Sequence, residues 1–198
     1  MNQLLIGLHG LARTGKDTAA TYLAAHYADW IILLADGQLR AVGAPEQVLT
    51  ASILHDVGKI ATPDRILFKA GPLDTSERNT MRQHAADGAR MLTQASLLMD
   101  NSRYLALGAE IALTHHEWYD GNGYPNGLAG EEIPLSGRLC ALADVFDALT
   151  SRRPYKAPWK ILQAIEQIRN LSGTQFDPVV VDAFLEVAEG RNKVKLVE

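Results

Sequence analysis

The chain carries histidines and aspartates in a spacing that suits metal coordination. Four of its six histidines lie in the middle of the sequence, each near a carboxylate or another histidine. Imidazole and carboxylate groups together suit zinc, iron, manganese and similar divalent ions. The candidate residues are His55, Asp56, His84, His115, His116, Asp144 and Asp147.

Two of these histidines are adjacent, which predicts more than one metal. Neighbouring side chains on an α-helix point about 100° apart, so His115 and His116 would aim at two different points. Asp56 could bridge two such metals through its two carboxylate oxygens. A metal pair can activate a water molecule and neutralise a phosphoryl group during in-line attack. Lys59, one turn beyond His55, could hold a phosphate oxygen.

Helices must position these residues, because helical patterns dominate after residue 50. Asp74 and Glu77 form a capping-box pattern that predicts the start of a long helix. His84 would then lie in the middle of that helix, and a glycine-rich segment at 120–127 predicts an exposed loop. Asp144 and Asp147 are three residues apart and would share a helix face. The predicted helices span residues 45–55, 74–95, 104–118, about 135–150, 158–171 and 178–189.

Length and composition predict one soluble domain, or one domain with a small appendage. The 198 residues are 47% hydrophobic and 21% charged, as in globular proteins. The formal net charge of −4 argues against a protein that coats nucleic acid or binds anionic membranes. Cys140 is the single cysteine, and neither a run of about 18 apolar residues nor a signal-peptide pattern is present. We therefore expect a cytoplasmic protein.

Several short motifs follow one another from residue 51 to about residue 188. In their order and spacing they resemble the HD-GYP group of metal-dependent phosphodiesterases, within the broader HD superfamily. The matching stretches are 54–60, 68–73, 81–84, 113–117, 120–128, 133–134, 143–150, 153–156 and 176–178.

The resemblance implies an all-helical fold and hydrolysis of cyclic di-GMP to pGpG or GMP. It also implies a non-haem centre of two, or three, iron or manganese ions. Asp56 and Lys59 would be catalytic. The implied metal ligands are His55, Asp56, His84, His115, His116 and Asp144.

The same resemblance implies how the substrate is bound. Lys59, Arg153 and Lys156 would contact its phosphate groups, and cationic side chains near a metal cluster suit a phosphodiester. The loop residues Gly123, Tyr124 and Pro125 would lie near the substrate and at a surface for protein partners. Neither a nucleic-acid polymer nor a membrane is expected as a partner.

One helix of the HD-GYP pattern is not recognisable in the sequence. It normally precedes the His-Asp pair and carries a further histidine, often with a glutamate one turn earlier. His26 lies at a similar separation from His55, but its surroundings do not match and no glutamate precedes it. Loss of these ligands would reduce metal affinity or metal number, so we expect at most two metals per chain.

The first 50 residues resemble other families. Residues 1–28 resemble the P-loop start of a phage-type deoxynucleoside monophosphate kinase, in which a strand at 4–8 precedes a phosphate-binding loop. Residues 29–50 resemble the hairpin and helix near the end of an ABC transporter ATPase core. The chain thus looks chimeric, with a segment at 1–50 and a helical domain at 51–198. The candidate phosphate-binding residues are Gly10, Gly15, Lys16 and Thr18.

The sequence therefore predicts a mainly α protein, an HD-domain helical bundle with a small α/β N-terminal appendage. Three functions remain open. The first is a metal-dependent cyclic di-GMP phosphodiesterase. The second is a catalytically weak or inactive module that binds ligands or protein partners. The third is a P-loop nucleotide kinase, which would depend on Lys16.

Overall fold

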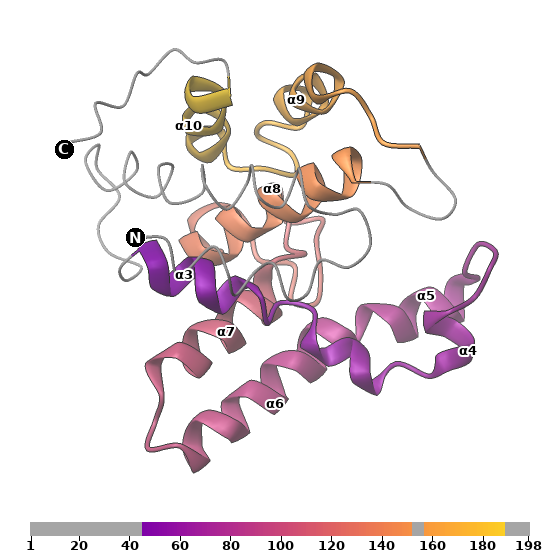
Figure 1. Ribbon diagram of the computed structural model, residues 1–198, viewed down its shortest axis with the longest axis vertical. Helices are drawn as coiled ribbons and strands as arrows, with labels where there is room; N and C mark the ends of the chain where they lie inside the picture. Colours follow the sequence, from indigo (N-terminus) through magenta and orange to yellow (C-terminus); the bar gives the residue numbers. More distant parts are fainter. Residues whose placement is uncertain (1–44, 152–156, 189–198) are drawn as a thin grey trace. The chain divides into compact units, whose positions relative to one another are not determined.

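A computed structural model describes residues 45–151 and 157–188, which are mainly α-helical (Figure 1). β pairing within these residues is limited to isolated bridges, such as the antiparallel bridge between Asp120 and Ala129. The predicted mainly α fold is confirmed for this part of the chain. The predicted α/β appendage, with its strand at 4–8, its P-loop at 10–18 and its hairpin within 29–43, lies outside the described residues.

The described residues fall into two compact units. The first contains residues 45–141 and 173–177, and the second contains residues 142–151, 157–172 and 178–188. The second unit holds the rest of α8, then α9 (Ile161–Asn170) and α10 (Pro178–Ala188). The elements of the first unit are α3 (Pro45–Ser52), the 3-10 helix η1 (Val57–Ala61), α4 (Asp64–Leu67), α5 (Thr75–Arg82), α6 (His84–Leu98), α7 (Arg103–Thr114), the 3-10 helix η2 (Gly130–Glu132) and the start of α8 (Leu135–Thr150).

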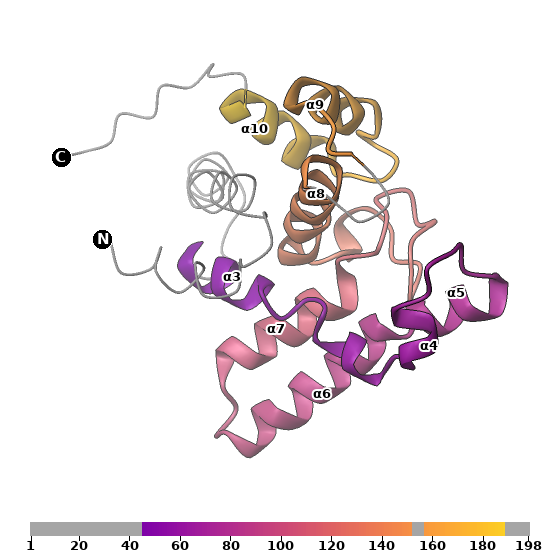
Figure 2. The ribbon, with the colours of Figure 1, turned by 45° about the vertical axis from the view of Figure 1, so that its right-hand side comes forward.

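Helices α6 and α7 form a hairpin in the first unit, and α3 packs on α7 (Figures 1 and 2). The two helices bury Leu92, Ala109 and Ala112 between them, with partly buried Leu54 and Val57 packed against this core. The small alanines let the two helices approach closely. Removal of this apolar surface from water stabilises the hairpin by roughly 25 cal/mol per Å² buried.

The 3-10 helix η1 lies against the start of α6, and a glycine makes this contact possible. A β-carbon built on Gly58 would lie 2.0 Å from the carbonyl oxygen of His84 and 2.4 Å from the backbone nitrogen of Gly88. No larger residue fits there without moving one of the two backbones. The contact holds Asp56, the N-cap of η1, close to His84, the first residue of α6.

The predicted capping box is present at the start of α5. The Glu77 N–H donates to Asp74 Oδ1 at 2.8 Å, and the Asp74 N–H donates to Glu77 Oε2 at 2.9 Å. The prediction of one helix over 74–95 is wrong, because the chain turns at Gln83. The Gln83 N–H donates to the Thr80 carbonyl at 3.2 Å, which is a tighter turn than that of an α-helix. His84 is consequently the first residue of α6 rather than the middle of a long helix.

Two other predicted helices end earlier than expected. The helix predicted at 45–55 ends at Ser52, because hydrogen bonds between residues three apart replace the α-helical pattern there. One of them joins the Leu54 N–H to the Ala51 carbonyl at 3.0 Å. The helix predicted at 104–118 ends at Thr114, where the Glu117 N–H bonds to the Thr114 carbonyl at 3.0 Å. The expected loop at 120–127 is confirmed.

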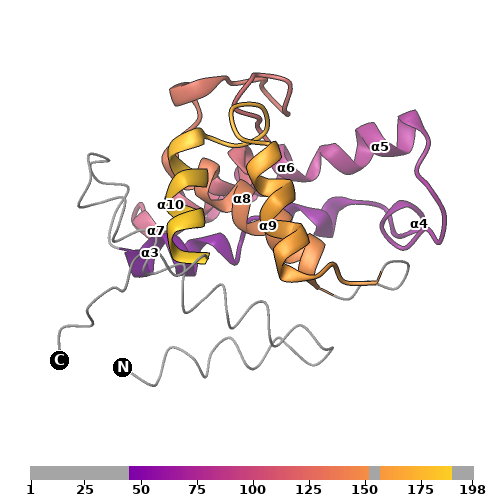
Figure 3. The ribbon, with the colours of Figure 1, turned by 90° about the horizontal axis from the view of Figure 1, so that it is seen from above.

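The second unit contains a small apolar core of its own. The rings of Phe146 and Phe184 pack edge to face with centroids 5.3 Å apart, and both side chains are buried. Helices α9 and α10 lie side by side (Figure 3). The Trp159 N–H donates to the Leu149 carbonyl at 2.9 Å, which joins the residue before α9 to the end of α8. The helices predicted at 135–150, 158–171 and 178–189 are confirmed as α8, α9 and α10, with α9 beginning three residues later than predicted.

Candidate metal centre

Four of the predicted ligands lie together in the first unit. Asp56, His84, His115 and His116 each offer one ligand atom, and these atoms all lie within 4.8 Å of one another. Asp56 precedes η1, His84 begins α6, and the two adjacent histidines directly follow α7. Three segments distant in the sequence therefore converge because η1 and α7 both pack against α6.

Backbone hydrogen bonds orient two of these imidazoles. His84 Nδ1 donates to the Met81 carbonyl at 2.7 Å, and His115 Nδ1 donates to the Ala112 carbonyl at 3.0 Å. A carbonyl oxygen only accepts, so the proton of each neutral ring lies on Nδ1 and the lone pair lies on Nε2. Such a second hydrogen bond fixes the tautomer and orientation of metal-binding histidines in general.

The Nε2 atoms of these two rings have no hydrogen-bond partner although both are fully buried. A buried polar atom without a partner costs free energy, about 1–3 kcal/mol. A divalent cation would satisfy both lone pairs at once. The donor set of three imidazoles and one carboxylate suits zinc, iron or manganese, so the cluster is consistent with a metal site.

The Asp56 carboxylate lies at the centre of the cluster. Its Oδ1 is 3.3 Å from His84 Nε2 and 3.9 Å from His115 Nε2. Its Oδ2 is 3.4 Å from His55 Nε2 and 2.5 Å from Lys59 Nζ. Both oxygens of one carboxylate thus face nitrogen atoms, as a carboxylate that bridges two sites would require.

His55 lies beside this cluster and is not one of the four converging residues. Its Nδ1 donates to the Ser52 carbonyl at 2.6 Å, so its Nε2 is also directed away from the backbone and toward Asp56. Asp144 and Asp147 lie on α8 in the second unit. Asp147 accepts a hydrogen bond from Ser151 at 2.8 Å. Ligand roles for His55 and Asp144 stay predictions.

The charge states of the cluster suit metal binding. Burial raises the pKa of Asp56, but hydrogen bonds and positive charge from His55 and Lys59 outweigh burial and hold that pKa well below its usual value. Burial lowers the pKa of His84. It also lowers the pKa of His115 to about 3 and that of His116 to about 2, with neighbouring imidazoles adding to the effect. At neutral pH the carboxylate is therefore charged and these three rings are neutral, which are the forms that bind metals.

The glycine-rich loop lies against the cluster through Tyr124. The Tyr124 ring stacks on the His116 ring with centroids 4.7 Å apart, and the Tyr124 N–H donates to the His116 carbonyl at 3.1 Å. Gly123 passes so close to α7's end that a β-carbon on it would lie 2.2 Å from the Trp118 nitrogen. The loop is thus held against the cluster.

Glu117 anchors this loop, a role that the sequence did not suggest. Its side chain is buried, and its two oxygens accept the N–H groups of Asn126 at 2.7 Å and Leu128 at 3.1 Å. The sequence offered one sign of this role: the Glu117 carboxylate lies between the paired histidines and the glycine-rich segment. Arg82, whose Cζ lies 4.8 Å from the Tyr124 ring centroid, also had no predicted role.

Of the predicted phosphate-binding residues, the structure describes Lys59 and not the others. Lys59 is half-exposed beside the cluster, where its ammonium group pairs with Asp56. Arg153 and Lys156 lie outside the described residues, as do His26 and the P-loop residues Gly10, Gly15, Lys16 and Thr18. The phosphate-binding roles of Lys59, Arg153, Lys156 and the P-loop residues stay predictions, and nothing tests His26 as a metal ligand.

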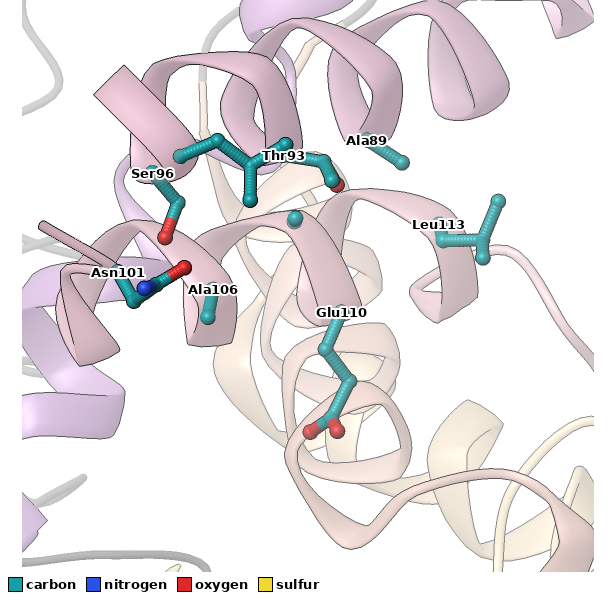
Figure 4. A pocket seen from close by; sticks show the side chains of 9 residues that line it. Ala89, Thr93, Ser96, Asn101, Ala106, Glu110 and Leu113 are labelled. Carbon is teal, nitrogen blue, oxygen red and sulfur yellow. The ribbon is translucent and has the colours of Figure 1, made fainter. Parts of the chain in front are cut away.

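A pocket of about 390 Å³ lies between α6 and α7 and contains none of the clustered histidines (Figure 4). Its walls are mostly apolar, with Ala89, Ala106 and Leu113 among them. Glu110 also lines it, but its carboxylate accepts a hydrogen bond from Ser136 at 2.5 Å. The Glu110 carboxylate in this pocket is therefore already engaged in a hydrogen bond. Within residues 45–151 and 157–188, no helix is long and apolar enough to cross a membrane.

Comparison with known proteins identifies the family of the chain. The sequence model of the HD domain family matches residues 38–180. The chain is 51% identical over 141 residues to a cyclic di-GMP phosphodiesterase of Thermotoga maritima, covering 71% of this chain and 37% of the relative. It is 50% identical over 144 residues to a cyclic di-GMP phosphodiesterase of Vibrio cholerae, covering 73% and 29%. The chain thus spans about a third of the length of these relatives.

A solved structure supports the fold. A protein of Bdellovibrio bacteriovorus, described as an HDG"Y"P protein, aligns with a TM-score of 0.59 at 16% identity, covering 95% of this chain and 57% of that one. The family match begins at residue 38 and so includes part of the segment that resembles an ABC transporter ATPase. The comparisons do not support the chimeric interpretation of residues 1–50. The chain belongs to the HD domain family.

Proposed function

We propose that this chain is a metal-dependent phosphodiesterase that hydrolyses cyclic di-GMP to pGpG or GMP. One observation carries the proposal: the buried Nε2 atoms of His84 and His115 lack hydrogen-bond partners and face the Asp56 carboxylate. The two relatives that share about half of their aligned residues with this chain are named as cyclic di-GMP phosphodiesterases. The substrate is inferred from those names.

The proposed metal centre contains two ions of iron or manganese type. Its proposed ligands are His55, Asp56, His84, His115, His116 and Asp144. When bound, such ions supply an activated water and neutralise charge on the phosphoryl group. Elemental analysis of the purified protein should find at most two tightly held metals per chain. Three such metals would contradict the proposed number.

The side chains of the cluster then have distinct tasks. Asp56 stays ionised and keeps both oxygens directed at nitrogen atoms. Lys59 neutralises charge on a phosphate oxygen, because its ammonium group already lies at the cluster with Asp56. The loop residues Gly123, Tyr124 and Pro125 line the substrate side and present a surface to protein partners. Arg153 and Lys156 add positive charge for the phosphates of the dinucleotide.

Incubation of manganese- or iron-loaded protein with cyclic di-GMP tests this function. Chromatography should show pGpG or GMP, and an Asp56→Asn variant should form far less of either. No product above a control with metal alone would contradict the proposal. Binding of cyclic di-GMP without product would instead select a ligand-binding module.

A further inference from the structure

Arg82 is an exposed cation that lies beside the candidate metal centre. It ends α5, two residues before His84, and its Cζ is 4.8 Å from the centroid of the Tyr124 ring. That ring stacks on His116. The Tyr124 ring therefore contacts both the Arg82 guanidinium and a candidate metal ligand.

The charge of Arg82 is not neutralised by the described part of the chain. Lys59, Arg90 and Arg138 each pair with an aspartate. No ion pair joins Arg82 to any carboxylate in residues 45–151 or 157–188. An uncompensated guanidinium next to this cluster is suited to an anionic ligand.

The contact with Tyr124 restricts the guanidinium while leaving it able to bind. A cation over an aromatic ring is attracted by the ring and keeps its full charge. The planar guanidinium has five N–H donors in a rigid fork that matches two oxygens of a phosphate. Restriction by the ring lowers the entropy that Arg82 would lose on binding a phosphate.

We infer that Arg82 binds the phosphate of cyclic di-GMP that is not being cleaved, an inference that rests on the proposed function. The phosphate under attack must lie at Asp56 and the histidines to meet the activated water. Arg82 instead lies over the Tyr124 ring and forms no ion pair with Asp56. A cyclic dinucleotide has a second phosphate, which is the remaining anion that Arg82 can contact.

Steady-state kinetics of the metal-loaded full chain test this role. Variants Arg82→Ala and Arg82→Lys are compared with Arg90→Ala, which removes an exposed arginine from the neighbouring helix α6. Arg82→Ala should raise KM for cyclic di-GMP by about ten- to a hundredfold, because a charge-assisted hydrogen bond contributes on that order. Its kcat and metal content should stay unchanged. Arg82→Lys should recover part of the loss, and Arg90→Ala should behave as the unaltered protein does.

The salt dependence of KM distinguishes a phosphate contact from other roles. Arg82→Ala should show a weaker rise of KM with sodium chloride, because one ionic contact is lost. An unchanged KM would overturn the inference. A raised KM with an unchanged salt dependence would also overturn it, because that result indicates a contact to the neutral base. A loss of unfolding free energy alone would overturn it as well, because that result indicates a structural role at the end of α5. Failure of the unaltered protein to cleave cyclic di-GMP would instead count against the proposed function itself.

Discussion

The Tyr124 ring stacks on the His116 imidazole, with an angle of 27° between the ring planes and 4.7 Å between centroids. The Tyr124 N–H also donates to the His116 carbonyl at 3.1 Å. One loop residue therefore contacts both the side chain and the backbone of a candidate ligand. The conformation of the loop and the orientation of the His116 ring are consequently linked.

Replacement of Tyr124 should show how much this stacking matters. Tyr124→Ala removes the ring from His116, and we expect kcat/KM for cyclic di-GMP to fall by about tenfold, since an aromatic pair contributes about 0.5–1.5 kcal/mol. Tyr124→Phe keeps the ring and should lose less activity. Equal activity of the two variants would show that the ring contact does not orient the histidine.

Removal of the Glu117 carboxylate should loosen the glycine-rich loop. Glu117→Ala leaves the N–H groups of Asn126 and Leu128 without their acceptor. We expect the free energy of unfolding in urea to fall by about 2 kcal/mol. The matched control is Glu131→Ala, which removes an exposed carboxylate from η2 and should have little effect. Similar stability of the two variants would contradict the anchoring role.

The close contact between η1 and α6 can be tested at Gly58. In Gly58→Ala the new methyl group would overlap backbone atoms of His84 and Gly88. We expect a loss of about 3 kcal/mol or more in the free energy of unfolding, and a lower melting temperature by calorimetry. Gly71→Ala is the control, because a β-carbon there meets nothing within 4 Å. An unaffected Gly58→Ala protein would show that η1 can move away from α6 at little cost.

Local sequence patterns predicted helix starts better than helix ends. The Asp74–Glu77 capping box was predicted and is present, because it involves residues three apart. The break at Gln83 was missed, since apolar periodicity does not distinguish an α-helical turn from the tighter turn seen there. The short helices η1 and α4 were also not predicted. Their position depends on packing, such as the contact of Gly58 with α6.

The candidate site was predictable in its residue types but not in its supporting contacts. Asp56, His84, His115 and His116 were predicted from type and spacing, and the structure brings them together. Their binding of metal stays a prediction. The roles of Glu117 and Arg82 depend on where the folded loop places Asn126, Leu128 and Tyr124, which no local pattern encodes.

The buried histidines should make the metal-free protein sensitive to acid. Burial holds the pKa values of His84, His115 and His116 below the ordinary value of 6.5. Below pH 6.5 the unfolded chain therefore binds more protons than the folded one, so stability falls as the pH falls. Each such histidine should remove on the order of 1 kcal/mol per pH unit.

Urea unfolding of the metal-free protein at about pH 7.5 and pH 5 checks this dependence. The free energy of unfolding should be lower at the more acidic pH. In a His115→Asn variant the pH dependence should be smaller, because one shifted histidine is absent. A stability that is constant or rises on acidification would show that these rings are protonated in the folded protein.

Anomalous diffraction from crystals of the manganese- or iron-loaded protein tests the metal centre most directly. We predict a metal peak about 2 Å from Nε2 of His84 and of His115 and from a carboxylate oxygen of Asp56, a usual length for bonds from nitrogen or oxygen to such metals. A peak bonded to other residues, or none at this cluster in loaded protein, would contradict the assignment of these buried nitrogen atoms as metal ligands.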